Sequence, residues 1–145
     1  MNDYADTGFI CSLYAPDAHS VRAIALMKRQ AAPLAFTWMH QLEFRNALRL
    51  RVFRSEIAPK QRDASLNLLL ADLASGVLTH SQAPLADVMT EAERLSALHS
   101  ERLGTRILDI LHVAAALVNG SRVFITFDIR QAKLAKAAGL KVKPA

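Results

Sequence analysis

Four carboxylates stand out because each one ends or interrupts an apolar stretch of the sequence. Asp6 and Asp128 each stand at the end of a predicted strand, and Asp109 lies inside an apolar helical pattern. Glu43 lies near the start of a helical pattern that follows another predicted strand. A buried carboxylate is costly unless it is protonated, paired with a cation or bound to a metal. These four residues are therefore the first candidates for chemistry.

If the predicted strands are parallel, these four positions can converge at the rim formed by the strands' carboxyl ends, where open α/β sheets bind ligands. Four clustered carboxylates would repel one another and raise their own pKa values. A hard divalent cation removes that repulsion, and a ligand set made only of oxygen suits Mg²⁺ or Mn²⁺. Such an ion lowers the pKa of a bound water and holds a phosphodiester for in-line attack.

Three of the four acids also have a purely structural explanation. Asp128 is as well explained as the N-cap of a following helix. Asp109 is explained by an ion pair with Arg106 or with another arginine. Glu43 is explained by the helix dipole, which favours negative charge near a helix N-terminus. Taken one at a time, none of the acids decides between structure and chemistry.

The elements that must position these acids alternate along the chain. The segment 104–139 predicts a buried helix over 107–118, a doubly covered strand over 123–127 and a helix over 130–138. A turn is expected at 6–8. The other predicted strands are 4–6, 34–38, 77–79 and 140–142, and the other predicted helices are 16–30, 40–54, 59–75 and 84–103. This order predicts an α/β fold, a three-layer α/β/α sandwich on a mostly parallel central sheet.

Composition limits the class of protein. The 145 residues, 52% hydrophobic and 21% charged, predict one globular domain over 1–145 rather than a disordered chain. No apolar run is long enough to span a membrane, and the N-terminus lacks the pattern of a signal peptide. Cys11 is the single cysteine, so no internal disulfide can form. A reducing, cytoplasmic setting is the expectation.

The net charge of +5 permits a polyanionic partner. The positive charge gathers in two segments, Arg45 to Arg62 and Arg130 to Lys143, each of which is equally compatible with a solvated helix face. A metal site amid basic surface would suit a phosphate-backbone substrate. Trp38 and Met39, ahead of the Glu43 helix, fit either the core or an interface patch, and the core is the favoured expectation.

Four stretches, taken together, carry a family resemblance. They are YADTGFICSLYAPD around Asp6, HQLEFRNALRL around Glu43, GTRILDILHVAAAL around Asp109 and VFITFDIRQAKLAKAAGLKV around Asp128. With these stretches in this order across almost the whole chain, the protein resembles the PIN-domain ribonucleases, and among them the VapC-type toxins of bacterial toxin–antitoxin pairs.

The resemblance implies a metal-dependent endoribonuclease in which Asp6, Glu43, Asp109 and Asp128 hold Mg²⁺ or Mn²⁺. The metal would activate water to cut RNA, such as tRNA or ribosomal RNA, and leave 5′-phosphate and 3′-hydroxyl ends. It also implies a homodimer inhibited by a small cognate antitoxin. Supporting polar positions match Thr7, Asn46 and Thr126. Two positions depart from the family: Gly8 replaces a frequent serine, and Asp3 replaces an apolar residue, which suggests a short first strand.

Other functions remain open. The main alternative is a catalytically silent module that binds RNA or the antitoxin and acts in autoregulation. A phosphate-receiver domain would need an aspartate at the end of a central strand, which the middle of the chain lacks. A di-iron helical bundle using His40 and His112 is contradicted by the strand signals. His112 is instead expected beside the acidic pocket, and His40 is expected to cap or border its helix.

Overall fold

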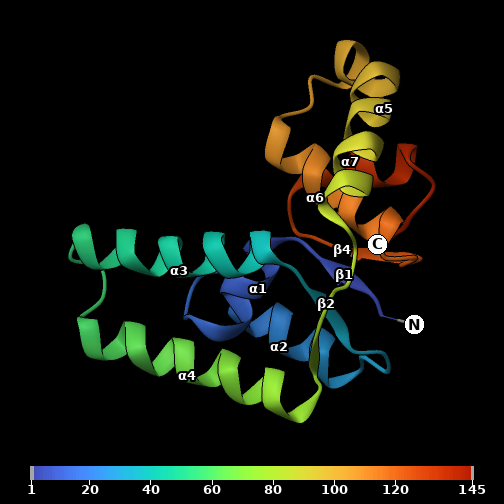
Figure 1. Cartoon of the computed structure of the whole chain (residues 1–145). Helices are drawn as coiled ribbons and strands as arrows, with labels where there is room; N and C mark the ends of the chain where they lie inside the picture. The colour runs from blue at the N-terminus through green and yellow to red at the C-terminus, as the bar shows by residue number, and fades with distance from the viewer. Residues whose placement is uncertain (1, 145) are drawn as a thin grey trace.

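The computed structural model describes residues 2–144 (Figure 1). Its strands are β1 (Tyr4–Ala5), β2 (Leu34–Phe36), β3 (Leu78–His80), β4 (Val123–Ile125) and β5 (Lys141–Lys143). Its helices are α1 (Thr7–Tyr14), α2 (Ser20–Lys28), α3 (Trp38–Phe53), α4 (Pro59–Ser75), α5 (Leu85–Leu103), α6 (Ile107–Val118) and α7 (Ile129–Ala137). No helix within residues 2–144 has the length and apolarity needed to cross a bilayer.

The strands form a parallel arrangement at the centre of the molecule. β4 pairs in parallel with β1 on one side and with β5 on the other, and β2 pairs in parallel with β3. A parallel bridge between Asp3 and Leu34 joins the two sets, which gives the order β5-β4-β1-β2-β3. β1 has only two residues, as the polar Asp3 suggested. The carboxyl ends of all these strands therefore meet at one rim.

Alternate strand residues face two helical layers. Tyr4, Phe124 and Val142 pack in a core with residues of α5, α6 and α7, to which Met39 of α3 also contributes. Ala5 and Ile125 lie in a second core with residues of α1, α2, α3 and α4. Figure 1 shows these two groups of helices on opposite sides of the strands. The predicted three-layer α/β/α sandwich with a parallel sheet is confirmed.

The predicted turn at residues 6–8 is wrong, because helix α1 begins there. Asp6 is its N-cap, and the Phe9 N–H donates to Asp6 Oδ1 at 2.8 Å. The helix is short and apolar on most sides because it packs inside the second core, so its sequence has no polar face to reveal a helical period. The predicted start of α2 is also wrong by four residues, because the helix begins at Ser20 rather than near Pro16.

The expectation for the pair at the start of α3 is half right. Met39 is buried, but the Trp38 side chain is 52% exposed. The two neighbours differ because consecutive helix positions point about 100° apart, so one can face the core while the other faces solvent.

Candidate functional site

The four carboxylates predicted from the sequence, Asp6, Glu43, Asp109 and Asp128, all line one cavity of about 780 Å³. Asp6 follows β1, and Asp128 comes three residues after the end of β4. Asp109 lies in the first turn of α6, the helix that precedes β4. A helix that leads into a parallel strand runs against it, so its N-terminus lies at the strands' carboxyl ends. The structure thus brings together the residues that the sequence singled out.

Asp6 is the most constrained of the four. Its carboxylate accepts the Phe9 N–H as the cap of α1 and accepts the Thr126 hydroxyl through its other oxygen. Burial raises the pKa of Asp6 above its ordinary value, the charge of Asp128 adds to this, and the two hydrogen bonds oppose it. Within residues 2–144, Asp6 forms no ion pair with a cationic side chain. Its negative charge is therefore only partly compensated.

Asp109 and Asp128 share one arginine. Arg106 Nε lies 3.4 Å from Asp109 Oδ2, and Arg106 Nη2 lies 3.9 Å from Asp128 Oδ2. The ion pair anticipated for Asp109 is thus present. Asp128 is also the N-cap of α7, since its Oδ1 accepts the Arg130 N–H at 2.8 Å and the Gln131 N–H at 3.2 Å. The cap leaves Oδ2 facing Arg106, so Asp128 serves structure and lines the cavity at once.

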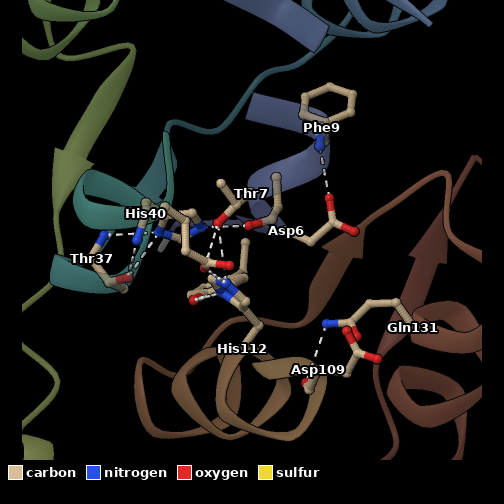
Figure 2. Close-up of polar contacts among 11 residues, drawn as sticks. Asp6, Thr7, Phe9, Thr37, His40, Asp109, His112 and Gln131 are labelled. Atoms are coloured by element: carbon tan, nitrogen blue, oxygen red, sulfur yellow. Dashed lines mark hydrogen bonds and ion pairs between the residues drawn. The ribbon is translucent and has the colours of Figure 1, made fainter. Parts of the chain in front are cut away.

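Gln131 ties α7 to the first turn of α6. Its side chain is almost fully buried, and its Nε2 donates to the Asp109 carbonyl at 3.2 Å (Figure 2). Its Oε1 has no hydrogen-bond partner among residues 2–144. The bond fixes the backbone that carries Asp109 relative to the helix that Asp128 caps.

Glu43 lies in the second turn of α3, beyond the reach of the helix dipole that the sequence suggested as its explanation. Glu43 Oε1 instead accepts His112 Nε2 at 2.5 Å and the Thr7 hydroxyl at 2.9 Å. Burial alone would raise the pKa of Glu43, but the hydrogen bonds from His112 and Thr7 outweigh it and hold this pKa below its ordinary value. Glu43 is therefore kept ionised.

His112 connects Glu43 to the interior of the sheet. Its Nδ1 accepts the Tyr4 hydroxyl at 2.7 Å, while its Nε2 faces Glu43. Burial raises the pKa of Tyr4 well above its ordinary value, so the phenol keeps its proton and donates. These contacts make a chain from Tyr4 through His112 to Glu43, and the expectation that His112 packs beside the acidic pocket is confirmed.

His40 caps α3 from inside the protein. With Thr37 it forms a capping box, in which the Thr37 N–H donates to His40 Nδ1 at 3.0 Å. Its other ring nitrogen, Nε2, is 2.7 Å from the Ala5 carbonyl and donates to it. Burial lowers the pKa of His40 to about 3. The neutral imidazole therefore joins the start of α3 to β1, and the predicted capping role is confirmed.

The protein is expected to lose stability below about pH 6.5 because of His40. The pKa of a histidine is about 6.5 in an unfolded chain, and that of His40 in the folded protein is about 3. Between these two pH values the unfolded chain binds a proton at this residue and the native protein does not. The free energy of unfolding should fall by about 1.4 kcal/mol per pH unit from this group. His40→Asn keeps an acceptor for Thr37 and cannot titrate. In urea titrations with EDTA from pH 6.5 to 5, its slope should be flatter, and equal slopes would contradict this account.

Some residues lie differently from their expected places. Asn46 is exposed on α3 and does not line the cavity. Thr126 does not line it either, but its hydroxyl donates a hydrogen bond to the Asp6 carboxylate. A Cβ at Gly8 would lie 3.6 Å from Asp6 Oδ1, in ordinary contact, so a serine hydroxyl there would fit beside that carboxylate. The sequence reasoning missed His19 and Phe127 as lining residues. Neither stands in a pattern that indicates chemistry.

The acids are spread around the cavity rather than gathered at a point. Within residues 2–144, no three Asp, Glu, His or Cys side chains lie close enough to hold one ion as they stand. Asp109 and Asp128 are paired with Arg106, and Glu43 is hydrogen-bonded to His112.

The family model described as "PIN domain" matches residues 4–137. The chain belongs to the PIN domain family. No curated protein sequence matches this PIN domain. Its fold is similar to that of VapC20 of Mycobacterium tuberculosis, described as a toxin that cleaves the sarcin–ricin loop, with 19% identity and a TM-score of 0.71 over 99% of this chain and 100% of that one.

Two further solved structures share the PIN fold. VapBC2 of Rickettsia felis, bound to a DNA fragment from its promoter, is 16% identical with a TM-score of 0.65, over 99% of this chain and 98% of that one. FitAcB of Neisseria gonorrhoeae is 17% identical with a TM-score of 0.59, over 96% of this chain and 94% of that one. At these identities the likeness concerns the fold.

Proposed function

We propose that this PIN domain is a metal-dependent endoribonuclease of the VapC type, the toxin of a toxin–antitoxin pair. The observation that carries the proposal is that carboxylates from four separate elements, Asp6, Glu43, Asp109 and Asp128, line one open cavity. A binding module gains nothing from collecting negative charge where burial already raises the pKa of Asp6. A phosphodiesterase that uses Mg²⁺ or Mn²⁺ needs such a site.

The residues fit a hard divalent cation by their chemistry. All four candidate ligands are carboxylates, and Asp6 has no cationic partner within residues 2–144. Asp109 and Asp128 point toward a shared cation already, the guanidinium of Arg106. Bound there, a divalent ion would supply an activated water and neutralise charge on the phosphate.

The chain's own residues prepare that site. Thr126 and the N-terminus of α1 fix the orientation of Asp6, and the Gln131 bond fixes the turn that carries Asp109. His112 and Thr7 hold Glu43 ionised at neutral pH, ready to bind a cation or to accept a proton from water. A carboxylate held ionised beside one whose pKa is raised is an arrangement suited to acid–base chemistry.

The partners proposed are RNA, a cognate antitoxin and a second copy of the chain, all in the cytoplasm. The sarcin–ricin loop activity named for VapC20 makes ribosomal RNA the first substrate to test, with tRNA beside it. The VapBC2 and FitAcB neighbours support an antitoxin partner. On α3, Trp38, Leu42 and Phe53 are 52%, 61% and 84% exposed, and such apolar exposure suits a protein interface.

The test is cleavage of a mixed ribosomal RNA and tRNA pool by the purified chain with Mg²⁺, Mn²⁺ or EDTA, beside Asp109→Asn. Metal-dependent cuts with 5′-phosphate ends, lost in the variant, would support the proposal. RNA or antitoxin binding without cuts under either metal would favour the silent autoregulatory module, which the arginine seated between two of the acids also allows.

Arg106→Gln is expected to tighten metal binding. The arginine competes with a cation for Asp109 and Asp128, and exposed ion pairs of this kind are worth about 0.2–1 kcal/mol each. Removing both pairs, about 0.4–2 kcal/mol in total, should lower the Kd for Mn²⁺ roughly two- to thirtyfold, measured by calorimetry without RNA. Arg94→Gln is the matched control, because it removes a similarly exposed i,i+3 pair with Glu91 on α5. An unchanged or weaker Kd in Arg106→Gln would contradict competition.

A further inference from the structure

A second cavity lies beside the acidic one and has the opposite charge. It measures about 400 Å³ and is lined by α2 and the residues just after it, by Phe127 after β4 and by the end of β5. Arg22, Arg29 and Lys143 line it, over a floor that includes Leu26 and Pro144. Its volume falls in the range of about 300–1,000 Å³ that is usual for small-ligand sites.

Phe127 separates the two cavities and lines both. On the acidic side, the His19 ring stacks on Phe127 with centroids 4.9 Å apart and an interplanar angle of 17°. On the basic side, the Arg22 guanidinium lies 4.8 Å from the centre of the same ring. Phe127 directly precedes Asp128 in the sequence. A nucleic-acid strand bound at the carboxylates and continuing past Phe127 would therefore enter the basic cavity.

The three cations are available to a ligand. Within residues 2–144, none of Arg22, Arg29 and Lys143 forms an ion pair with a carboxylate. The Arg22 guanidinium lies over the Phe127 ring and forms no ion pair within residues 2–144, so its N–H groups are available for the paired bonds that arginine makes with phosphate. Arg22 lies in the first turn of α2 and Arg29 is its C-cap residue, seven positions later, and both line the same cavity.

We propose that this basic cavity is a subsite for a nucleotide flanking the cleaved bond, whose phosphate binds Arg22, Arg29 and Lys143. The apolar floor receives part of the sugar or base, and the cations neutralise the backbone. An RNA strand is favoured over an acidic protein segment because two aromatic rings, His19 and Phe127, lie beside the Arg22 guanidinium, a combination suited to bases that stack and are joined by phosphates. The inference deepens the proposed ribonuclease function and rests on it for the identity of the strand.

The test measures binding rather than cleavage. A fluorescent single-stranded RNA is titrated in EDTA at several salt concentrations with wild type, with Arg22→Gln/Arg29→Gln and with Lys28→Gln/Lys60→Gln. The control pair removes the same charge from exposed positions outside the cavity, one of them on α2 itself. Each phosphate contact contributes about 0.7 to the slope of log Kd against log salt for single strands, so the arginine variant should lose about 1.4.

The control variant should keep the wild-type slope, and Arg22→Lys/Arg29→Lys should keep most of it. Equal slopes in the arginine and control variants would overturn the subsite. So would an unchanged RNA slope with lost binding of a polyglutamate peptide, which would assign the cavity to an acidic protein segment. RNA cleavage is measured separately, so that the two proposals can be told apart. A smaller salt slope in the arginine variant, with no cleavage by wild type, supports the subsite alone. Cleavage by wild type, with an unchanged salt slope in the arginine variant, supports the nuclease alone.

Discussion

Asp6→Asn is expected to abolish RNA cleavage while making the metal-free protein more stable at neutral pH. Removing a residue that only hydrogen-bonds to a metal ligand costs about 10- to 100-fold in activity. Asp6 is itself a proposed ligand, so its replacement should cost more. The asparagine oxygen can still accept the Phe9 N–H and cap α1. The amide can also donate to Thr126 Oγ1, so the fold keeps its local contacts.

The gain in stability follows from the sign of the pKa shift. Burial raises the folded pKa of Asp6 above its unfolded value of 3.8. The stability that this group contributes is therefore complete below pH 3.8 and is lost as the pH rises through the folded pKa. An ionised Asp6 destabilises the protein at pH 7, and a neutral asparagine removes that penalty. The difference between variant and wild type should shrink toward pH 4.

Urea unfolding in EDTA and in Mg²⁺ tests both parts. Wild type should gain stability from Mg²⁺ by mass action, and Asp6→Asn should gain less. Asp63→Asn, at an exposed carboxylate on α4 that pairs with Arg62, controls for the change in net charge. A variant that cuts RNA at the wild-type rate, or that is less stable than wild type in EDTA at pH 7, would contradict this role for Asp6.

Local signals in the sequence are enough for the longer elements. The predicted bounds of α4 and α6 match the structure, because Pro59 stands at the first helical position of α4 and Gly76 ends it with a left-handed φ of 87°. Helix α1 was not predicted because it is eight residues long and mostly buried, so its apolar residues show no helical period. Local propensity could not separate it from a continuing strand.

The convergence of the acids was predictable because it follows from topology. Once the strands are parallel, residues at their carboxyl ends must share one rim, whatever the side chains do. The contacts between the acids and their neighbours were not predictable in the same way. Tyr4 and His112 are 108 positions apart, and Glu43 and His112 are 69 apart. No periodicity encodes such pairs, so only the fold reveals that His112 controls Glu43.

His112→Asn is expected to lower RNA cleavage about 10- to 100-fold, the usual cost of losing a group that orients a metal ligand. The asparagine oxygen can take the place of Nδ1 and accept the Tyr4 hydroxyl, but its side chain is too short to reach Glu43. His112→Gln has the opposite character. Its amide nitrogen can take the place of Nε2 and donate to Glu43, while Tyr4 loses its acceptor.

Stability and activity should therefore separate. Both variants leave one partner of a buried hydrogen bond unsatisfied, so each should lose about 1–3 kcal/mol of unfolding free energy. Only His112→Asn should lose most of its activity, because only there is Glu43 released. Tyr4→Phe is the matched control: it removes the hydroxyl alone, leaves His112 Nδ1 without its partner and should cost about 1–3 kcal/mol while leaving cleavage within a few-fold of wild type.

Cleavage rates at saturating Mn²⁺, together with urea unfolding of all three variants, decide the matter. If His112 merely supports the fold, activity should follow stability, and His112→Gln should be as impaired as His112→Asn. If His112 acts through Glu43, activity should follow the donor at the Nε2 position, whatever the stability. The distinction is available because the two ring nitrogens face different partners, Tyr4 on the sheet side and Glu43 on the cavity side.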